Sequence, residues 1–189
     1  MDHEGDDGDD GDDSNDSDDS EDMFLRRRIR RTKSGLFAIN LPDEERELLS
    51  DLPAQLRQLL GSDDPDARAS LRRLFPTAYN LDAEKDEEFH QLMREDLMAS
   101  KLARAELLET TAAATELTEA QLLSWMGAIN DIRLVLGTRL DVSEGDDEPD
   151  ADHPLAGHFG LYHYLGFLLE NVIRALSAGS ENRNSATAG

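Results

Sequence analysis

The chain has 189 residues, of which 42 are Asp or Glu and 19 are Lys or Arg, so its formal net charge at pH 7 is −23. Proteins that coat nucleic acids non-specifically depend on Lys and Arg meeting phosphates, so this balance argues against that class. The chain contains no cysteine, which excludes disulfides, thiolate metal sites and thiol redox chemistry within it. Its length suits one well-packed domain and is short for two.

Residues 1–22 form an acidic segment with thirteen Asp or Glu and no Lys or Arg. No large apolar residue precedes Met23, so this segment cannot bury enough surface to offset the entropy lost on ordering. It supplies −13 of the net charge and leaves −10 for the rest. We therefore predict a disordered acidic tail over residues 1–22, a folded domain over residues 23–179 and a disordered tail over residues 180–189.

The sequence lacks the usual marks of export or membrane insertion. Its N-terminus is acidic where a signal peptide begins with basic residues, and no stretch approaches 18 consecutive apolar residues. We therefore expect a cytoplasmic protein that does not bind membranes.

Residues 23–41 are predicted to form a β-hairpin. In its second half Phe37, Ile39 and Leu41 alternate with smaller or polar residues, the period of a half-buried strand, and "TKSG" before them is typical of a turn. The first half is strongly basic, with Arg26, Arg27, Arg28, Arg30, Arg31 and Lys33. These six residues are our candidate contacts for a partner or a nucleic acid.

Helical periodicity begins at Pro42 with a stripe of leucines. Pro53 interrupts this stripe and is expected to kink or split the helix, because proline lacks an N–H and clashes with the preceding turn. A short helix is predicted from about Asp66 to Phe75, ended by Pro76.

Two longer helices are predicted next. Residues 83 to about 110 carry a wide apolar face, and "ETTAAATELT" is interpreted as a connection. Thr118 and Gln121 have the spacing of a capping box, which opens a helix that runs to about Leu140. That helix is apolar almost all round, so we expect it to lie centrally, with Trp125 in the core.

The last helix is predicted to follow an acidic loop. Residues 141–152 hold seven acidic residues and no basic one, which indicates an exposed loop. Pro154 then opens a helix that should end near Gly179. The predicted fold is therefore mainly α, a single-domain helical bundle with a small N-terminal β-hairpin.

The segments "WMGAINDIRLVLGTRLDV" and "YHYLGFLLENVIRAL" resemble the actinobacterial family known as domain of unknown function 2017, whose named branch is the oxidative stress regulators. The resemblance covers roughly Phe24 to Leu176. It implies a small, mostly helical cytoplasmic protein with a part in transcriptional control of the oxidative stress response. That branch is associated with a thiol switch near the N-terminus, where this chain has acidic residues and no cysteine.

A second set of candidate residues lies in the matching segments and consists of Asn130, Asp131, Arg133, Arg139 and Glu170. Arg133 lies within "IRLVL", where an unpaired charge would be costly to bury, so it is expected to find a carboxylate. Glu170 on the last helix is the first candidate, which would make a structural ion pair between two core helices. The alternative is a ligand or partner site where Asn130, Asp131, Arg133 and Arg139 emerge at the surface.

Metal and enzyme chemistry find little support in the sequence. Glu87 and His90 have the i, i+3 spacing of di-iron carboxylate helices, but no second Glu-x-x-His is present. His153, His158 and His163 are five residues apart and therefore do not share a helix face. No Gly-rich phosphate loop or nucleophile elbow occurs, so we expect neither a cofactor nor an enzyme.

The leading hypothesis is a non-enzymatic regulatory or adaptor protein that contacts another protein, with RNA polymerase or a sigma factor as the expected partner. The alternatives are a DNA-binding regulator that uses the basic hairpin, and an enzyme of unknown reaction. The acidic tail is long enough to reach the hairpin, since 22 flexible residues span about 26 Å. It could therefore act as a weak internal competitor for the hairpin's partners, or serve solubility alone; the oligomeric state is left open.

Overall fold

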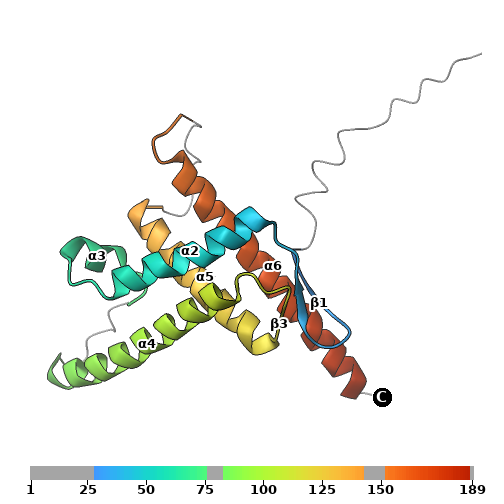
Figure 1. The fold of residues 1–189 in the computed structure, drawn as a ribbon. Helices are drawn as coiled ribbons and strands as arrows, with labels where there is room; N and C mark the ends of the chain where they lie inside the picture. The colour runs from blue at the N-terminus through green and yellow to red at the C-terminus, as the bar shows by residue number, and fades with distance from the viewer. Residues whose placement is uncertain (1–27, 76–82, 143–151, 188–189) are drawn as a thin grey trace, which may run out of the picture.

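The computed structural model describes residues 28–75, 83–142 and 152–187 and, within residues 83–94 and 179–187, the backbone alone. Figure 1 shows its elements in chain order: β1 (Ile29–Arg31), β2 (Phe37–Ile39), α2 (Asp43–Leu60), α3 (Pro65–Ser70), α4 (Ala83–Thr111), β3 (Glu116–Leu117), α5 (Glu119–Arg139) and α6 (Ala156–Thr187). The predicted fold class is confirmed, because helices dominate and the strands form one small sheet. The predicted acidic tail and most of the acidic loop lie outside the described residues.

The predicted hairpin is present. Strands β1 and β2 pair antiparallel, with Ile29 opposite Ile39 and Arg31 opposite Phe37. The turn between them places Gly35 at a φ of +86°, a backbone conformation that residues with a Cβ rarely adopt. Ile29, Phe37 and Ile39 are buried, so one face of the sheet belongs to the core.

A third strand, β3, was not predicted. It pairs antiparallel with β2, placing Phe37 opposite Leu117, and gives the sheet the order β1-β2-β3. We interpreted the sequence "ETTAAATELT", which contains the two residues of β3, as a connection. Leu117 is nevertheless buried, so a two-residue strand is enough to complete the sheet.

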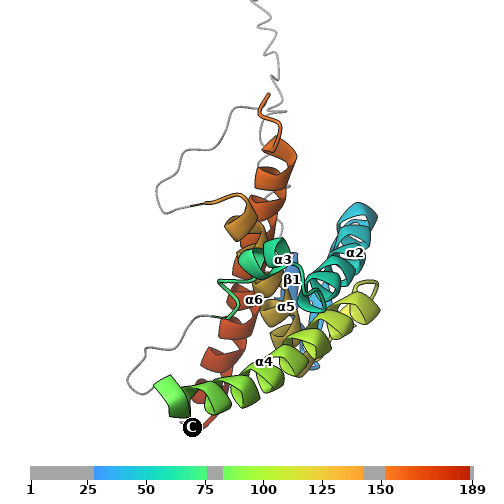
Figure 2. The same cartoon turned by 90° about the vertical axis from the view of Figure 1, so that its left-hand side faces the viewer.

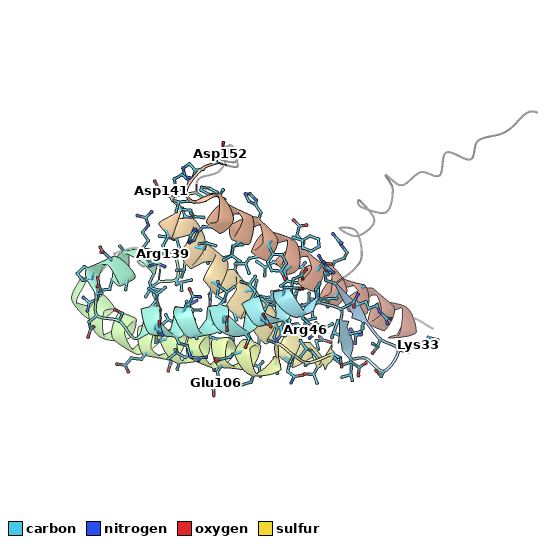
Figure 3. All side chains as sticks on the ribbon, turned by 45° about the horizontal axis from the view of Figure 1, so that its top comes forward. Lys33, Arg46, Glu106, Arg139, Asp141 and Asp152 are labelled. Atoms are coloured by element: carbon cyan, nitrogen blue, oxygen red, sulfur yellow. The ribbon has the colours of Figure 1, made fainter. Side chains whose placement is uncertain are left out.

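Arg46 on α2 ties the sheet to the helices through four backbone carbonyls. Its Nε and Nη2 donate to Leu41 O and Ile39 O, each at 3.0 Å, and its Nη1 donates to Ala112 O at 2.9 Å and Ala114 O at 2.8 Å. Ile39 is the last residue of β2 and Leu41 follows it, whereas Ala112 and Ala114 lie between α4 and β3. One guanidinium group thus satisfies carbonyls from two segments that are distant in the sequence. In Figure 3 Arg46 is labelled between the hairpin, marked by Lys33, and the rest of the bundle.

Helix α2 is continuous through Pro53, so the predicted split there is wrong. Pro53 is buried, and Leu52 and Leu56 on either side are buried as well. Packing of this face against α4 stabilises the helix enough to tolerate the lost N–H. Helix α3 is shorter than predicted: Asp64 caps its N-terminus, and it ends at Ser70 in a series of turns.

Helix α5 is central, as predicted, and packs against α2, α3, α4 and α6. Its N-terminus has the predicted capping box, in which Gln121 N donates to Thr118 Oγ1 and Thr118 N donates to Gln121 Oε1. Trp125 is fully buried and donates from its indole Nε1 to Thr111 Oγ1 at 2.7 Å. Its predicted place in the core is therefore confirmed. In the turned view of Figure 2, α6 lies beside α5 and α4 crosses in front of their lower parts.

Helix α6 is longer than predicted. It begins at Ala156 and continues to Thr187, so the predicted end at Gly179 is wrong. Glycine inside a helix costs about 1 kcal/mol relative to alanine, which weakens a helix but does not require it to stop. Helix α6 packs against α5 and β1.

Candidate functional site

The basic hairpin is partly used for internal contacts. Arg28 donates from Nη2 to Glu45 Oε1 at 2.9 Å, and the hydroxyl of Tyr164 donates to Glu45 Oε2 at 2.9 Å. The backbone N–H of Arg28 also donates to Asn171 Oδ1 at 3.3 Å. Glu45 belongs to α2 and Tyr164 to α6, so Arg28 fastens the start of the hairpin to two helices. The side chain of Arg28 is therefore used to hold the fold together, which makes it a weaker candidate for a partner contact.

The other cations of the hairpin differ in exposure. Arg31 lies over the ring of Phe37, 5.4 Å from its centroid, and its Nη1 is 3.6 Å from Glu119 Oε2. Arg30 and Lys33 are exposed, while Arg26 and Arg27 lie outside the described residues. Among the described residues of the hairpin, two candidate cations, Arg30 and Lys33, are therefore exposed to solvent.

The Tyr164–Glu45 contact gives the hairpin anchor a pH dependence. Burial raises the pKa of Tyr164 strongly, and the negative charge and hydrogen bond of Glu45 raise it further. The folded protein therefore keeps this proton at a pH where the unfolded chain, with an ordinary pKa of about 10, has lost it. The contribution to stability is complete below that pKa and is lost as the pH rises above it.

We expect Tyr164→Phe to weaken this alkaline loss of stability. Chemical denaturation between about pH 8 and pH 11 should show a smaller decrease for the variant than for the wild type. At neutral pH the variant should be less stable by about 1.5 to 3 kcal/mol, because one hydrogen bond to a charged acceptor is lost. Equal slopes for the two proteins in the alkaline range would contradict the assignment of this proton to Tyr164.

The structure separates the members of the second candidate set: some lie at the surface, whereas Asp131 is buried in the core. Asp131 Oδ1 accepts a hydrogen bond from Lys101 Nζ at 2.7 Å, and both side chains are less than one-tenth exposed. Asp131 Oδ2 has no hydrogen-bond partner and lies 3.8 Å from Nη2 of Arg104. This buried ion pair between Lys101 and Asp131 joins α4 to α5, and Arg104 lies beside it as a second cation. Neither cation was predicted from the sequence.

Gly127 creates the space for Arg104. A Cβ at Gly127 would lie 2.5 Å from Arg104 Nη1, so any side chain there would displace the guanidinium group. Lys101 could have been noticed from the sequence, because positions 101, 105, 108 and 112 follow a helical period and the other three are buried apolar residues. A lysine in that stripe indicates a buried partner.

The predicted pair between Arg133 and Glu170 is wrong. No ion pair joins them among the described residues; the guanidinium group of Arg133 instead lies over the ring of Tyr162, 4.2 Å from its centroid, while Glu170 is exposed. Arg133 also rests against Gly166, where a Cβ would be 3.4 Å from Nε. Arg133 Nε is buried without a hydrogen-bond partner. The ring and the glycine therefore take the place that we assigned to a carboxylate.

The remaining members of the set lie at the surface. Asn130 and Arg139 are exposed. Figure 3 places Arg139 near Asp141 at the end of the bundle opposite the hairpin residue Lys33. Near that end, Arg73 donates to Val142 O at 2.9 Å. The second set of candidate residues is therefore not a single cluster.

Within the described ranges 28–75, 83–142 and 152–187, no group of three or more His, Cys, Asp or Glu residues is arranged to hold a metal ion. In the same ranges, no helix combines the length and the apolar character needed to cross a bilayer.

The geometry defines a mainly helical protein whose small sheet is anchored to its helices by charged side chains. Comparison with known proteins gives the family: residues 26–176 match the model of domain of unknown function 2017, and the chain belongs to this family. It is similar to the oxidative stress regulator AosR of Mycobacterium tuberculosis, with 32% identity over 153 residues, covering 71% of this chain and 67% of the relative.

A second relative is the putative oxidative stress regulator AosR of Mycobacterium leprae, 32% identical over 156 residues, covering 72% of this chain and 69% of the relative. No solved structure matches this chain. The family resemblance inferred from the sequence is confirmed, and the names of these relatives support a regulatory role.

Proposed function

We propose that this protein is a non-enzymatic, cytoplasmic regulator of the oxidative stress response that acts by contact with another protein, and that RNA polymerase or a sigma factor is the partner. The names of the relatives support the regulatory part of this proposal. The observation that favours protein contact over DNA contact is the state of the hairpin. Its arginines Arg28 and Arg31 lie against protein carboxylates and an aromatic ring, which leaves Arg30 and Lys33 exposed among the described residues.

The absence of cysteine from the chain shapes the mechanism. A chain without cysteine forms no disulfide of its own, so in this proposal the oxidative signal reaches the protein through its partner or through a change in its abundance. The hairpin is suited to a short docking contact. Arg28 and Arg46 hold it rigidly on the helices, so binding costs little ordering of its backbone.

The proposal is tested with the full-length protein immobilised through its C-terminus. RNA polymerase core enzyme, purified sigma factors and a duplex DNA are offered separately over a series of salt concentrations. We expect saturable binding of the polymerase or of a sigma factor. The double variant Arg30→Glu/Lys33→Glu should weaken it, while the fold persists because Arg28 is untouched. Glu106→Lys, an exposed change on α4, is the matched control and should bind as the wild type does.

DNA binding with a steep dependence on salt would contradict protein contact and favour the DNA-binding alternative, because each neutralised phosphate contributes about −0.9 to the logarithmic slope. A pull-down from cytoplasm that returns metabolic enzymes alone would also count against the proposal. Repeating the DNA measurement without residues 1–22 tests the acidic tail: equal binding with and without the tail at low salt would show that it does not compete for the hairpin.

A further inference from the structure

Helices α5 and α6 present a common exposed face. Figure 1 shows the two helices running in opposite directions, and Arg133 of α5 meets Tyr162 and Gly166 of α6. Residues three, four or seven positions apart share one side of a helix. The residues that share this side are Leu123, Met126, Asn130 and Arg133 on α5, and Tyr162, Gly166, Leu169, Glu170 and Ile173 on α6. We call this set the α5–α6 face.

The α5–α6 face carries exposed apolar side chains. Ile173 is 52% exposed and Leu123 is 45% exposed, and they are the two most exposed of the large apolar side chains that the structure describes. Met126 and Leu169 are half-buried on the same side of their helices. Single exposed apolar residues are ordinary, but several on one face of two packed helices are typical of an interaction surface.

Within the part of the chain that the structure describes, the two charges of the face have no ion-pair partner. Among the described residues, Arg133 has no carboxylate within ion-pair distance, although Arg28, Arg31, Arg57 and Arg104, which are similarly half-buried, each have one. Glu170 is exposed and has no described cation within that distance. It lies one turn of α6 beyond Gly166, against which Arg133 rests. A cation and an anion on one face, neither with an ion-pair partner among the described residues, can be paired by a second copy of that face.

We propose that the α5–α6 face is the interface of a two-fold symmetric dimer, in which Arg133 of each copy pairs with Glu170 of the other. In an isologous interface the same patch meets itself, so each contact between unlike residues occurs twice. A two-fold axis that crosses α6 between Gly166 and Glu170 brings the two unlike charges together. The same arrangement covers Ile173 and Leu169 with apolar surface from the second copy.

The dimensions of the face suit such a dimer. Stable interfaces bury about 800 Å² on each partner. Helix α6 has 32 residues and is therefore about 48 Å long, enough to supply that area together with α5. Two chains with a net charge of −23 repel each other at long range. The α5–α6 face itself offers Arg133 to the approaching copy, which makes it a favourable side for close contact. Assembly through this face is independent of the proposed regulatory role.

Sedimentation velocity of the full-length protein over about 1 to 100 μM tests the dimer, since mass action makes assembly depend on concentration. We expect a wild-type dimer that dissociates on dilution. Ile173→Glu should raise the dissociation constant by at least about tenfold, because it places a charge in the apolar part of the interface. Leu155→Glu, a matched change at a side chain that is 40% exposed before α6, should leave assembly unchanged.

A charge exchange distinguishes the proposed pairing from a non-specific apolar contact. Arg133→Glu and Glu170→Arg should each weaken the dimer, because each sets two like charges against each other, and the double variant should restore it. Glu170→Arg changes an exposed residue, so its effect on assembly cannot be attributed to misfolding. A wild-type protein that stays monomeric at about 100 μM, or a double variant no better than its single parents, would overturn the proposal.

Discussion

Asp131→Ala is expected to lower the free energy of unfolding by roughly 3 to 5 kcal/mol, because it leaves the ammonium group of Lys101 buried without its partner. The two side chains are 5% and 7% exposed, so water does not replace the lost carboxylate. Arg104 cannot compensate, since its charge has the same sign as that of Lys101. Urea denaturation followed by circular dichroism measures the change directly.

The double variant Lys101→Met/Asp131→Leu tests whether the loss comes from the unpaired charge of Lys101. Apolar residues of similar volume often replace a buried ion pair with little loss, so we expect the double variant to be much more stable than Asp131→Ala. Glu106→Ala on the exposed side of α4 is the control and should change stability by less than about 0.5 kcal/mol. If Asp131→Ala resembles this control, the pair is not buried in solution.

Arg46→Lys is expected to lower the free energy of unfolding by roughly 3 to 5 kcal/mol, although it keeps the charge. Hydrogen bonds from a charged donor contribute about 1.5 to 3 kcal/mol each. A lysine ammonium group cannot reach four carbonyls in two segments. The loss should appear in thermal unfolding and in faster hydrogen exchange of the sheet amides. Arg72→Lys is a matched control, because Arg72 meets Asp141 in an exposed pair and should contribute little. Equal melting temperatures for the two variants would show that Arg46 does not hold the sheet.

The sequence predicted helices better than it predicted the contacts between them. Thr118 and Gln121 located the start of α5, and the turn around Gly35 located the hairpin, because both signals are local. Pro53 was misleading, since packing along α2 outweighs a local preference. β3 was missed because its two residues carry no periodicity of their own.

The candidate site was harder to predict for the same reason. Periodicity places Arg133 and Glu170 on their helices, but it does not say where along α6 the helix α5 crosses. The crossing sets Arg133 against Tyr162 and Gly166, which lie about two turns and one turn before Glu170 on α6. The ion pair between Asp131 and Lys101 depends in the same way on how α4 meets α5. Local sequence signals do not contain these distances.

The pairing of β2 with β3 sets the order in which a growing chain can fold. Phe37 meets Leu117, and Arg46 bonds to the carbonyls of Ala112 and Ala114, so the sheet cannot be completed before α4 has been synthesised. Until then β3 does not cover the edge of β2, and Arg31 lacks its neighbour Glu119. Non-local pairings of this kind slow folding and leave strand edges exposed to other chains. While this chain is being synthesised, the β2 edge of its N-terminal hairpin therefore stays uncovered until residues 116–117 have emerged.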